Sequence, residues 1–413
     1  MHNDPAARIC YIAYPTSLTL QSANAIQTWT TLRELRRLRP HTLALIPRWL
    51  AEPSRFAQVG VVHLPRPAIG KLSRLHRTTL LYYLEHSAFA WMCWLYLLGA
   101  RLRGRRYDVV YVRQVVCAAW FAAGLARVLG MRVIYEAHDW ETRNPSRAKE
   151  PWARGLLHLL DRLALTRVTA LVSLTDHFLR ELALIGWRPR TTAVIPDGFD
   201  DEQYVPRDRD AARARLEIDR NAFVIVYAGM TFSHRGLDRL VDAFAGAALP
   251  LSKLILVGGR PKEIAELREQ VDGLGLAEQV TLTGPHAQET VAEYLAAADV
   301  LVIPDTVTDI TASPLKLFEY MAMARPIISV DLPALREVVD ERAARFVRRG
   351  DTADLRAALR ELSNDPARRA EMGRQARVQA APWTYAARAK RIVALCDNVV
   401  NRQDAKNAKT TIN

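Results

Sequence analysis

Short apolar runs alternate with helical segments along almost the whole chain, and this alternation is the feature that most constrains its fold. In the first half, strands are predicted at 9–14, 107–113, 132–136 and 170–173, and helices at 22–38 and 118–129. Strands that are separated by helices pair in parallel, so the first half predicts a doubly wound α/β sheet.

A second series of the same kind follows a linker-like segment at 191–206. Its predicted strands are 223–228, 253–258, 280–283, 300–303 and 326–330, and its predicted helices are 237–245, 261–274, 290–297 and 315–324. A single core stops growing near roughly 250 to 300 residues, so a chain of 413 residues is expected to form two such domains. Ligands of parallel sheets bind outside the carboxyl ends of the strands, which places the expected site in a cleft.

The formal net charge of +13 is confined to the first half of the chain. Residues 1–200 hold 27 Lys and Arg against 14 Asp and Glu, whereas residues 201–413 hold 30 of each. A basic half beside a neutral half indicates an anionic partner such as nucleic acid, a lipid surface or an acidic substrate. No nucleic-acid-reading module accompanies the charge, so nucleic acid is not an expected partner.

The cysteines and the apolar segments indicate a cytoplasmic protein. The four cysteines are far apart and lack C-x-x-C spacing, which disfavours a disulfide framework and a zinc site. The start of the chain lacks the basic and apolar regions of a secretory signal. The most apolar window, 87–100, has about 14 residues and is too short for the roughly 20 that cross a bilayer.

The helical window 78–100 combines tryptophans, tyrosines and apolar residues and then runs into RLRGRR at 101–106. This composition fits an interfacial helix on an anionic membrane surface, where each nearby arginine contributes about 1 kcal/mol. The alternative is a core helix that ends in a solvated basic turn.

Residues 308–339 carry the richest set of polar signals. Ser313 and Pro314 precede a helix that is predicted to begin at Leu315, so its free backbone N–H groups favour a phosphate. Lys316 adds a positive charge, and Glu319 lies one turn further on the same face, where a carboxylate can accept hydrogen bonds from a ribose diol. The alternative is an ordinary surface pair of Lys316 and Glu319.

Two other strand ends carry candidate residues. Gly258 and Gly259 follow a predicted strand and could let the backbone approach a nucleobase, although strand-to-helix turns use glycine in any case. His138 follows the strand at 132–136; a single histidine is often structural, and its neighbour Asp139 fits a helix cap or an acceptor contact. Gly198, in the linker, fits a turn.

The segment SPLKLFEYMAMARPIISVDLPALREVV at 313–339 resembles the donor-binding segment of the retaining family-4 glycosyltransferases of the GT-B fold, in the subset written SP-x-K-x-FEYMA. The resemblance extends through VIPDGFD, YAGMTFSHRGLDRLVDAFA, LILVGG and VTLTGPHAQETVAEYLAAADVLVIP, and covers nearly all of 194–383. The first half is similar only through YEAHD at 135–139 and a Ser-Ala-Asn turn at 22–24.

The resemblance implies roles for individual residues of the donor domain. Glu319 takes the place of the glutamate that binds the donor ribose. Eight residues earlier, where the family has a glutamate on the donor sugar, this chain has Thr311, with Asp309 close enough to substitute. In the segment that begins at Gly229, Met230 replaces the first of two diphosphate-binding cations and Arg235 takes the place of the second.

The resemblance also implies that His138 contacts the donor sugar or phosphate from the first domain, and that Lys316 offsets the loss of a cation at Met230. The domains expected from it are an acceptor-side domain at 1–200, a nucleotide-sugar domain at 201–382, and a helix returning toward the first domain with a tail at 383–413. Each of the first two is expected to be Rossmann-like.

The implied function is transfer of a sugar, with retention, from a nucleotide-diphosphate sugar to an acceptor hydroxyl in cell-surface polysaccharide or glycolipid assembly. The acceptor is expected to be lipid-linked or a saccharide, no metal or other cofactor is expected, and the protein is expected on the inner face of the cell membrane. Two alternatives are open: a catalytically silent nucleotide-sugar binder, suggested by Thr311 and Met230, and a sugar-nucleotide epimerase, for which no acid–base residues are identified.

Overall fold

The computed structural model describes residues 6–66, 79–138, 140–144, 151–232, 235–306, 313 and 315–410. Contacts divide the chain into two compact units, which we call the first unit (Met1–Pro196 with Tyr385–Asn413) and the second unit (Asp197–Thr384). The chain therefore passes between the units twice. The boundaries expected from the sequence, after residues 200 and 382, lie within a few residues of these two passages.

A parallel sheet forms the centre of the first unit, in the order β3-β2-β1-β4-β5-β6-β7. Cys10 of β1 pairs with Leu43 on one side and with Val110 on the other, so the strand order reverses between β1 and β4. Nearly every residue of the central strands is buried. The strands are β1 Ile9–Ile12, β2 Leu43–Arg48, β3 Val62–Pro65, β4 Val109–Val112, β5 Arg132–Ala137, β6 Ala170–Ser173 and β7 Thr192–Val194.

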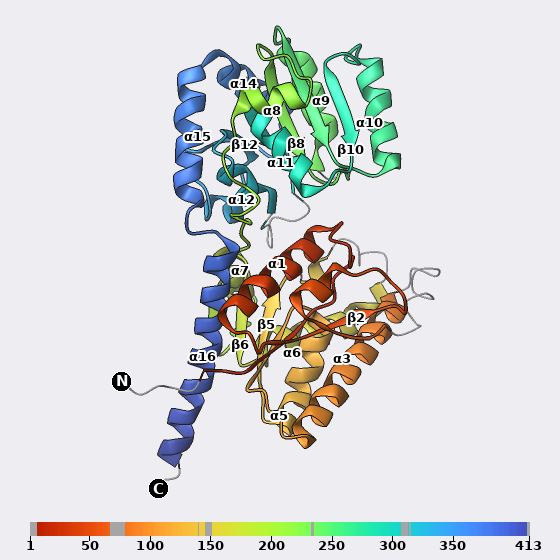
Figure 1. The fold of residues 1–413 in the computed structure, drawn as a ribbon, viewed down its shortest axis with the longest axis vertical. Coiled ribbons are helices and arrows are strands. Elements are labelled where there is room, and N and C mark those ends of the chain that lie inside the picture. Colours follow the sequence, from red (N-terminus) through yellow and green to blue (C-terminus); the bar gives the residue numbers. More distant parts are fainter. Residues whose placement is uncertain are drawn as a thin grey trace. The chain divides into compact units, whose positions relative to one another are not determined.

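Helices cover both faces of this sheet, because right-handed crossovers on the two sides of β1 lead to opposite faces. The last helix of the chain, α16, packs along α1 and also contacts β5, as Figure 1 shows within the first unit. On the other face, α3 packs against α4, and α4 against α6. The helices are α1 Ala23–Leu38, α3 Thr79–Leu102, α4 Val115–Trp120, α5 Ala126–Leu129, α6 Arg154–Thr166, α7 Asp176–Leu184 and α16 Tyr385–Thr410.

The second unit repeats the plan with a sheet in the order β10-β9-β8-β11-β12-β13, which is parallel throughout. Its strands are β8 Phe223–Ala228, β9 Ser252–Val257, β10 Val280–Gly284, β11 Val300–Ile303, β12 Ile327–Val330 and β13 Ala344–Val347. Its helices are α8 Arg209–Arg215, α9 Leu237–Ala247, α10 Pro261–Gly273, α11 Gln288–Ala297, α12 Leu315–Ala322, α13 Pro333–Arg336, α14 Thr352–Asn364 and α15 Pro366–Ala380.

The predicted fold class, two doubly wound Rossmann-like sheets, is confirmed. The helix predicted at 118–129 differs from the structure: it begins earlier, at Val115, because the Gln114 side chain accepts a hydrogen bond from the backbone N–H of Cys117 and so caps α4. A π-helical turn at Phe121–Leu125 then separates α4 from α5. The helix expected at 22–38 is capped in the same way by Ser22, whose hydroxyl accepts from Ala25.

Candidate functional site

Two glycine turns meet at the carboxyl ends of β8 and β9 in the second unit. Gly229 has φ +144° and Gly258 has φ +110°, a conformation that favours glycine. A Cβ atom on Gly258 would lie 2.4 Å from the carbonyl oxygen of Gly229, and a Cβ atom on Gly229 would lie 2.9 Å from Nζ of Lys316. The space that a side chain at Gly258 would need is therefore filled by the backbone of Gly229, and the space that one at Gly229 would need is filled by the Lys316 amine.

Lys316, in the first turn of α12, is buried rather than part of a surface pair, so the alternative of an exposed Lys316–Glu319 pair is wrong. Its amine donates to the Tyr227 hydroxyl at 2.8 Å and lies 3.9 Å from the centre of that ring. Tyr227 in turn donates to the carbonyl oxygen of Met230 at 2.6 Å. Burial, together with the nearby charge of Arg235, holds the pKa of Lys316 well below its usual value.

Glu319 lies one helical turn after Lys316, as the spacing predicts. Burial raises the pKa of this carboxyl to about 7, although a hydrogen bond from Tyr204 and the charge of Lys316 both act in the opposite direction. The carboxylate is therefore a hydrogen-bond acceptor that gains or loses a proton near neutral pH. An incoming diol would supply further donors to the ionised form.

Two polar groups near these turns lack partners within the described part of the chain. The Nε atom of Arg235 and the hydroxyl of Thr231 are both buried, and neither forms a hydrogen bond there. Gly259 has φ +100°, and a Cβ atom on it would lie 2.4 Å from Oγ1 of Thr231. Buried donors without partners are costly, so this end of the sheet is suited to a ligand with hydrogen-bond acceptors.

The start of α12 is only partly described. Leu315 begins the helix as expected, and the hydroxyl of Ser313 accepts a hydrogen bond from the backbone N–H of Asp197 at 3.4 Å. The candidates Thr311 and Asp309 lie outside the described residues. Met230, which stands where the family has a cation, has 37% of its surface exposed.

His138 belongs to the first unit, directly after β5, and its ring is held by charged neighbours. Its Nε2 atom lies 2.6 Å from Oε1 of Glu136 and 2.8 Å from Nη2 of Arg113. Arg388 of α16 reaches the same carboxylate oxygen at 2.7 Å. Sequence reasoning selected His138 but missed Glu136, Arg113 and Arg388. These residues could have been found from their positions in the sequence. Glu136 and Arg113 are charged residues within or next to an apolar strand, and Arg388 is a charged residue on the buried face of a helix.

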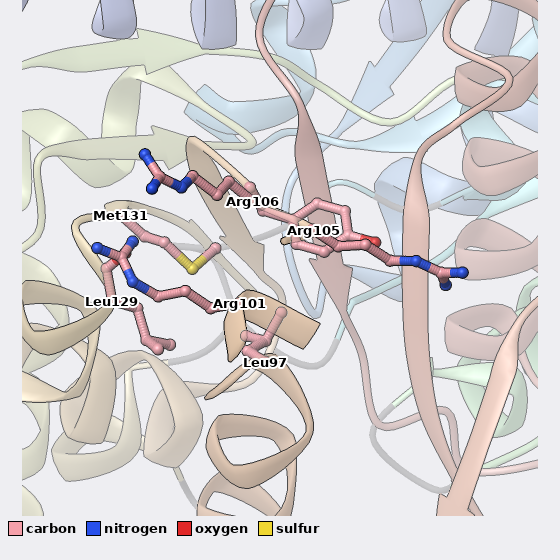
Figure 2. A pocket seen from close by; sticks show the side chains of 7 residues that line it. Leu97, Arg101, Arg105, Arg106, Leu129 and Met131 are labelled. Atoms are coloured by element: carbon pink, nitrogen blue, oxygen red, sulfur yellow. The ribbon is translucent and has the colours of Figure 1, made fainter. Parts of the chain in front are cut away.

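A basic hollow lies at the end of α3, where four arginines at positions 101, 103, 105 and 106 are exposed. Arg101, Arg105, Arg106 and Tyr107 line this shallow hollow over an apolar floor of Leu97, Leu129 and Met131. Figure 2 shows Arg105 extending away from Arg101 and Arg106. Within the described ranges, no helix is both long and apolar enough to cross a membrane, and no three His, Cys, Asp or Glu side chains are grouped as metal ligands.

Comparison with known proteins assigns both halves of the chain. Residues 25–198 match the family described as "Glycosyl transferase 4-like domain", and residues 222–365 match "Glycosyl transferases group 1". A D-inositol 3-phosphate glycosyltransferase from Geodermatophilus obscurus is 30% identical over 213 residues, which cover 49% of this chain and 45% of the relative. A second from Catenulispora acidiphila is 29% identical over 225 residues, covering 52% and 53%. The chain thus spans about half the length of the curated relatives it matches.

Solved structures share the whole fold. The sucrose-phosphate synthase of Thermosynechococcus elongatus superposes with a TM-score of 0.76 at 20% identity, covering 96% of this chain and 100% of that one. Anabaena Alr3699/HepE, solved in complex with UDP, gives 0.70 at 17% identity, covering 98% and 100%. The fold is therefore that of a two-domain GT-B glycosyltransferase. Its two domain matches show that both halves of the chain are glycosyltransferase domains.

Proposed function

We propose that the chain transfers a sugar from a nucleotide-diphosphate sugar to an acceptor hydroxyl, and that the second unit binds the donor. The observation that carries this proposal is the buried amine of Lys316 beside the bare backbone of Gly229, with Arg235 near enough to lower its pKa. Burial and Arg235 disfavour the charged form of the Lys316 amine, and a diphosphate bound beside it would favour that form again. Glu319 is positioned one turn away to accept from the ribose.

The proposed chemistry needs no protein nucleophile. Arg235, Lys316 and the first N–H groups of α12 stabilise the departing diphosphate, which then helps to deprotonate the acceptor hydroxyl on the same face of the sugar. This course retains the configuration of the anomeric carbon. No metal or other cofactor takes part in the proposal. His138 contributes from the first unit as a contact to the donor sugar or phosphate.

We propose a lipid-linked acceptor at an anionic membrane surface, in polysaccharide or glycolipid assembly at the inner face of the cell membrane. The support is the outer face of α3, where Leu84, Trp91, Leu95 and Leu102 recur at helical spacing and remain exposed, Leu102 by 80%. The arginines at 101–106 continue this face at its carboxyl end, and apolar residues beside arginines are suited to anionic lipid.

Donor turnover is tested by incubating the protein with UDP-, GDP-, dTDP- and ADP-glucose and extracted lipid acceptors, and measuring nucleotide release and glycolipid product. UDP-glucose comes first, because the Anabaena neighbour was solved with UDP. Lys316→Ala and Glu319→Ala should each lower turnover strongly while the thermal unfolding profile is kept. Wild-type rates in both variants would refute the assignment. Binding of a nucleotide sugar without release or transfer would instead identify a silent binder.

Membrane contact is tested by sedimentation with vesicles of phosphatidylcholine and phosphatidylglycerol. In the triple variant with glutamine at Arg103, Arg105 and Arg106, the protein should no longer sediment with the vesicles. The matched control carries glutamine at three exposed cations of the second unit, Arg220, Lys262 and Arg268, and should sediment like the wild type. Equal sedimentation of the two triple variants would contradict the proposed surface.

A further inference from the structure

A buried charge cluster in the first unit connects the last helix of the chain to the end of β5. The carboxylate of Glu136 is fully buried, and its Oε1 atom lies 2.9 Å from Nε of Arg113 and 2.7 Å from Nη2 of Arg388. The Tyr111 hydroxyl donates to the other oxygen, Oε2. The remaining contact of Oε1 is with Nε2 of His138, at 2.6 Å.

The two guanidinium groups keep Glu136 ionised. Burial alone would raise the pKa of this carboxyl, but Arg388 and Arg113 outweigh burial and hold it well below its usual value. An ionised carboxylate can only accept hydrogen bonds.

Both arginines are fixed by further contacts. Arg113 donates to the Thr28 hydroxyl at 2.6 Å. Arg388 donates from Nε to the carbonyl oxygen of Pro196 at 3.1 Å and from Nη1 to the Thr31 hydroxyl at 3.3 Å. Since each guanidinium is anchored on several sides, the carboxylate between them has little freedom to turn.

This arrangement selects one protonation pattern for the imidazole. Arg113 can only donate, so Nε2 of His138 cannot accept from Arg113 and donate to Glu136 at the same time. The negative carboxylate is the nearest partner of Nε2, at 2.6 Å against 2.8 Å for Nη2 and 3.1 Å for Nε of Arg113, which assigns the proton to Nε2. The other ring nitrogen, Nδ1, is then left for a contact outside the cluster.

We infer that Arg388, contributed by the first turn of the C-terminal helix, is a positioning residue for His138: it holds Glu136 so that the carboxylate fixes the orientation and tautomer of the imidazole. The inference rests on the proposed function in one respect, because His138 acts there on the donor. The site of the first unit is thus completed by a residue that lies 250 positions after His138 in the chain.

The tautomer is the direct test, and it does not require turnover. Full-length protein is labelled with 15N-histidine, the His138 resonances are assigned with His138→Gln, and long-range 1H–15N correlations report which ring nitrogen carries the proton. We expect the Nε2–H form in the wild type, and a mixture of tautomers in Arg388→Met and in Glu136→Gln. Lys390→Met removes an exposed cation two positions along the same helix and should leave the spectrum unchanged. Arg388→Lys keeps a cation and should retain mostly the Nε2–H form.

Kinetics separate positioning from structural support. With UDP-glucose as the probe, Arg388→Met should lower kcat by about 10- to 100-fold, the range that follows from misplacing a reacting group. The dissociation constant for UDP, most of whose proposed contacts lie in the second unit, should change much less than kcat. Should Arg388→Met fail to fold, Glu136→Asp carries the same comparison, and Arg388→Lys is then the conservative variant that should keep most of kcat.

An unchanged His138 tautomer in the Arg388 and Glu136 variants would overturn the inference. So would a kcat for Arg388→Met that is no lower than the kcat of the control Lys390→Met. Failure of the proposed function looks different. In that case the wild type neither binds UDP nor releases it from UDP-glucose, whereas the tautomer still depends on Arg388.

Discussion

Replacing Lys316 with methionine tests two effects of the buried amine: its effect on the stability of the fold and its effect on donor binding. In the free protein the amine is buried, donates to Tyr227 at 2.8 Å and has a pKa well below its usual value because of burial and Arg235. A bound diphosphate reverses this balance, since its negative charge favours the ammonium form. We therefore predict that UDP binding to the wild type takes up a proton at Lys316.

The magnitudes follow from the contacts. Methionine keeps the apolar stem but loses one hydrogen bond, about 1 kcal/mol, and it also removes a buried basic group that disfavours folding. These effects oppose each other, so the free energy of unfolding should change by less than about 1 kcal/mol. A charge-assisted hydrogen bond to phosphate contributes about 1.5–3 kcal/mol, so the dissociation constant for UDP should rise on the order of 10- to 100-fold.

Isothermal titration of UDP at pH 7.5 measures both quantities, when it is repeated in buffers that differ in ionisation enthalpy. The buffer dependence of the apparent enthalpy should report more proton uptake for the wild type than for Lys316→Met. Lys262→Met, in the exposed first turn of α10, is the control and should behave like the wild type. Equal UDP affinities for the wild type and Lys316→Met, with no proton uptake in either, would refute the reasoning.

Two further predictions concern pH and a glycine turn. The pKa of Glu319 is raised to about 7, so its carboxylate protonates as the pH falls through 7 and should then bind the ribose less well. In Lys316→Met, which lacks the amine that takes up a proton, titrations from pH 6 to 8 should therefore show UDP affinity falling with pH, and adding Glu319→Gln should flatten this profile. Gly259→Ala places a Cβ atom 2.4 Å from Thr231 Oγ1 at φ +100°, and urea unfolding should show a loss of about 1–3 kcal/mol. Gly273→Ala, whose added methyl meets nothing within 4 Å, should show no such loss, and equal stabilities would contradict the prediction.

The central strands could be predicted from sequence because they are buried on both faces. The predicted strands at 170–173, 223–228 and 300–303 coincide with β6, β8 and β11. The strands β2, β3, β7 and β13 were missed, and β7 lies in the segment 191–206 that was predicted to be a linker. For β3 the reason is visible, because VHLP lies at the edge of the sheet and only Leu64 is buried. The order of strands depends on contacts between distant segments, which a single sequence does not reveal.

The candidate donor site shows a similar division. The position of Lys316 and Glu319 on one face of α12 follows from their spacing, and the structure bears out that placement. Lys316 is buried and Glu319 partly buried, and their hydrogen-bond partners Tyr227 and Tyr204 lie about 90 and 115 positions earlier in the chain. The opposite pKa shifts of the two groups therefore depend on contacts that spacing does not reveal.

The cluster around His138 is the part that could not be predicted. Glu136 and His138 are neighbours in sequence, but Arg113 comes from the preceding strand end and Arg388 from the last helix. No motif spacing links residues so far apart. Only the return of α16 to the first unit, seen in Figure 1, brings Arg388 to the end of β5.

The central claim, that the second unit binds a nucleotide-diphosphate sugar, is tested most directly by a thermal-shift series with UDP-, GDP-, dTDP- and ADP-glucose. A ligand at 100 times its dissociation constant stabilises the folded state by about 2.7 kcal/mol, so one base should raise Tm by several degrees. The shift should be lost in Glu319→Ala and retained in Lys390→Met. No shift with any of the four, at ligand concentrations up to several millimolar, would contradict the claim.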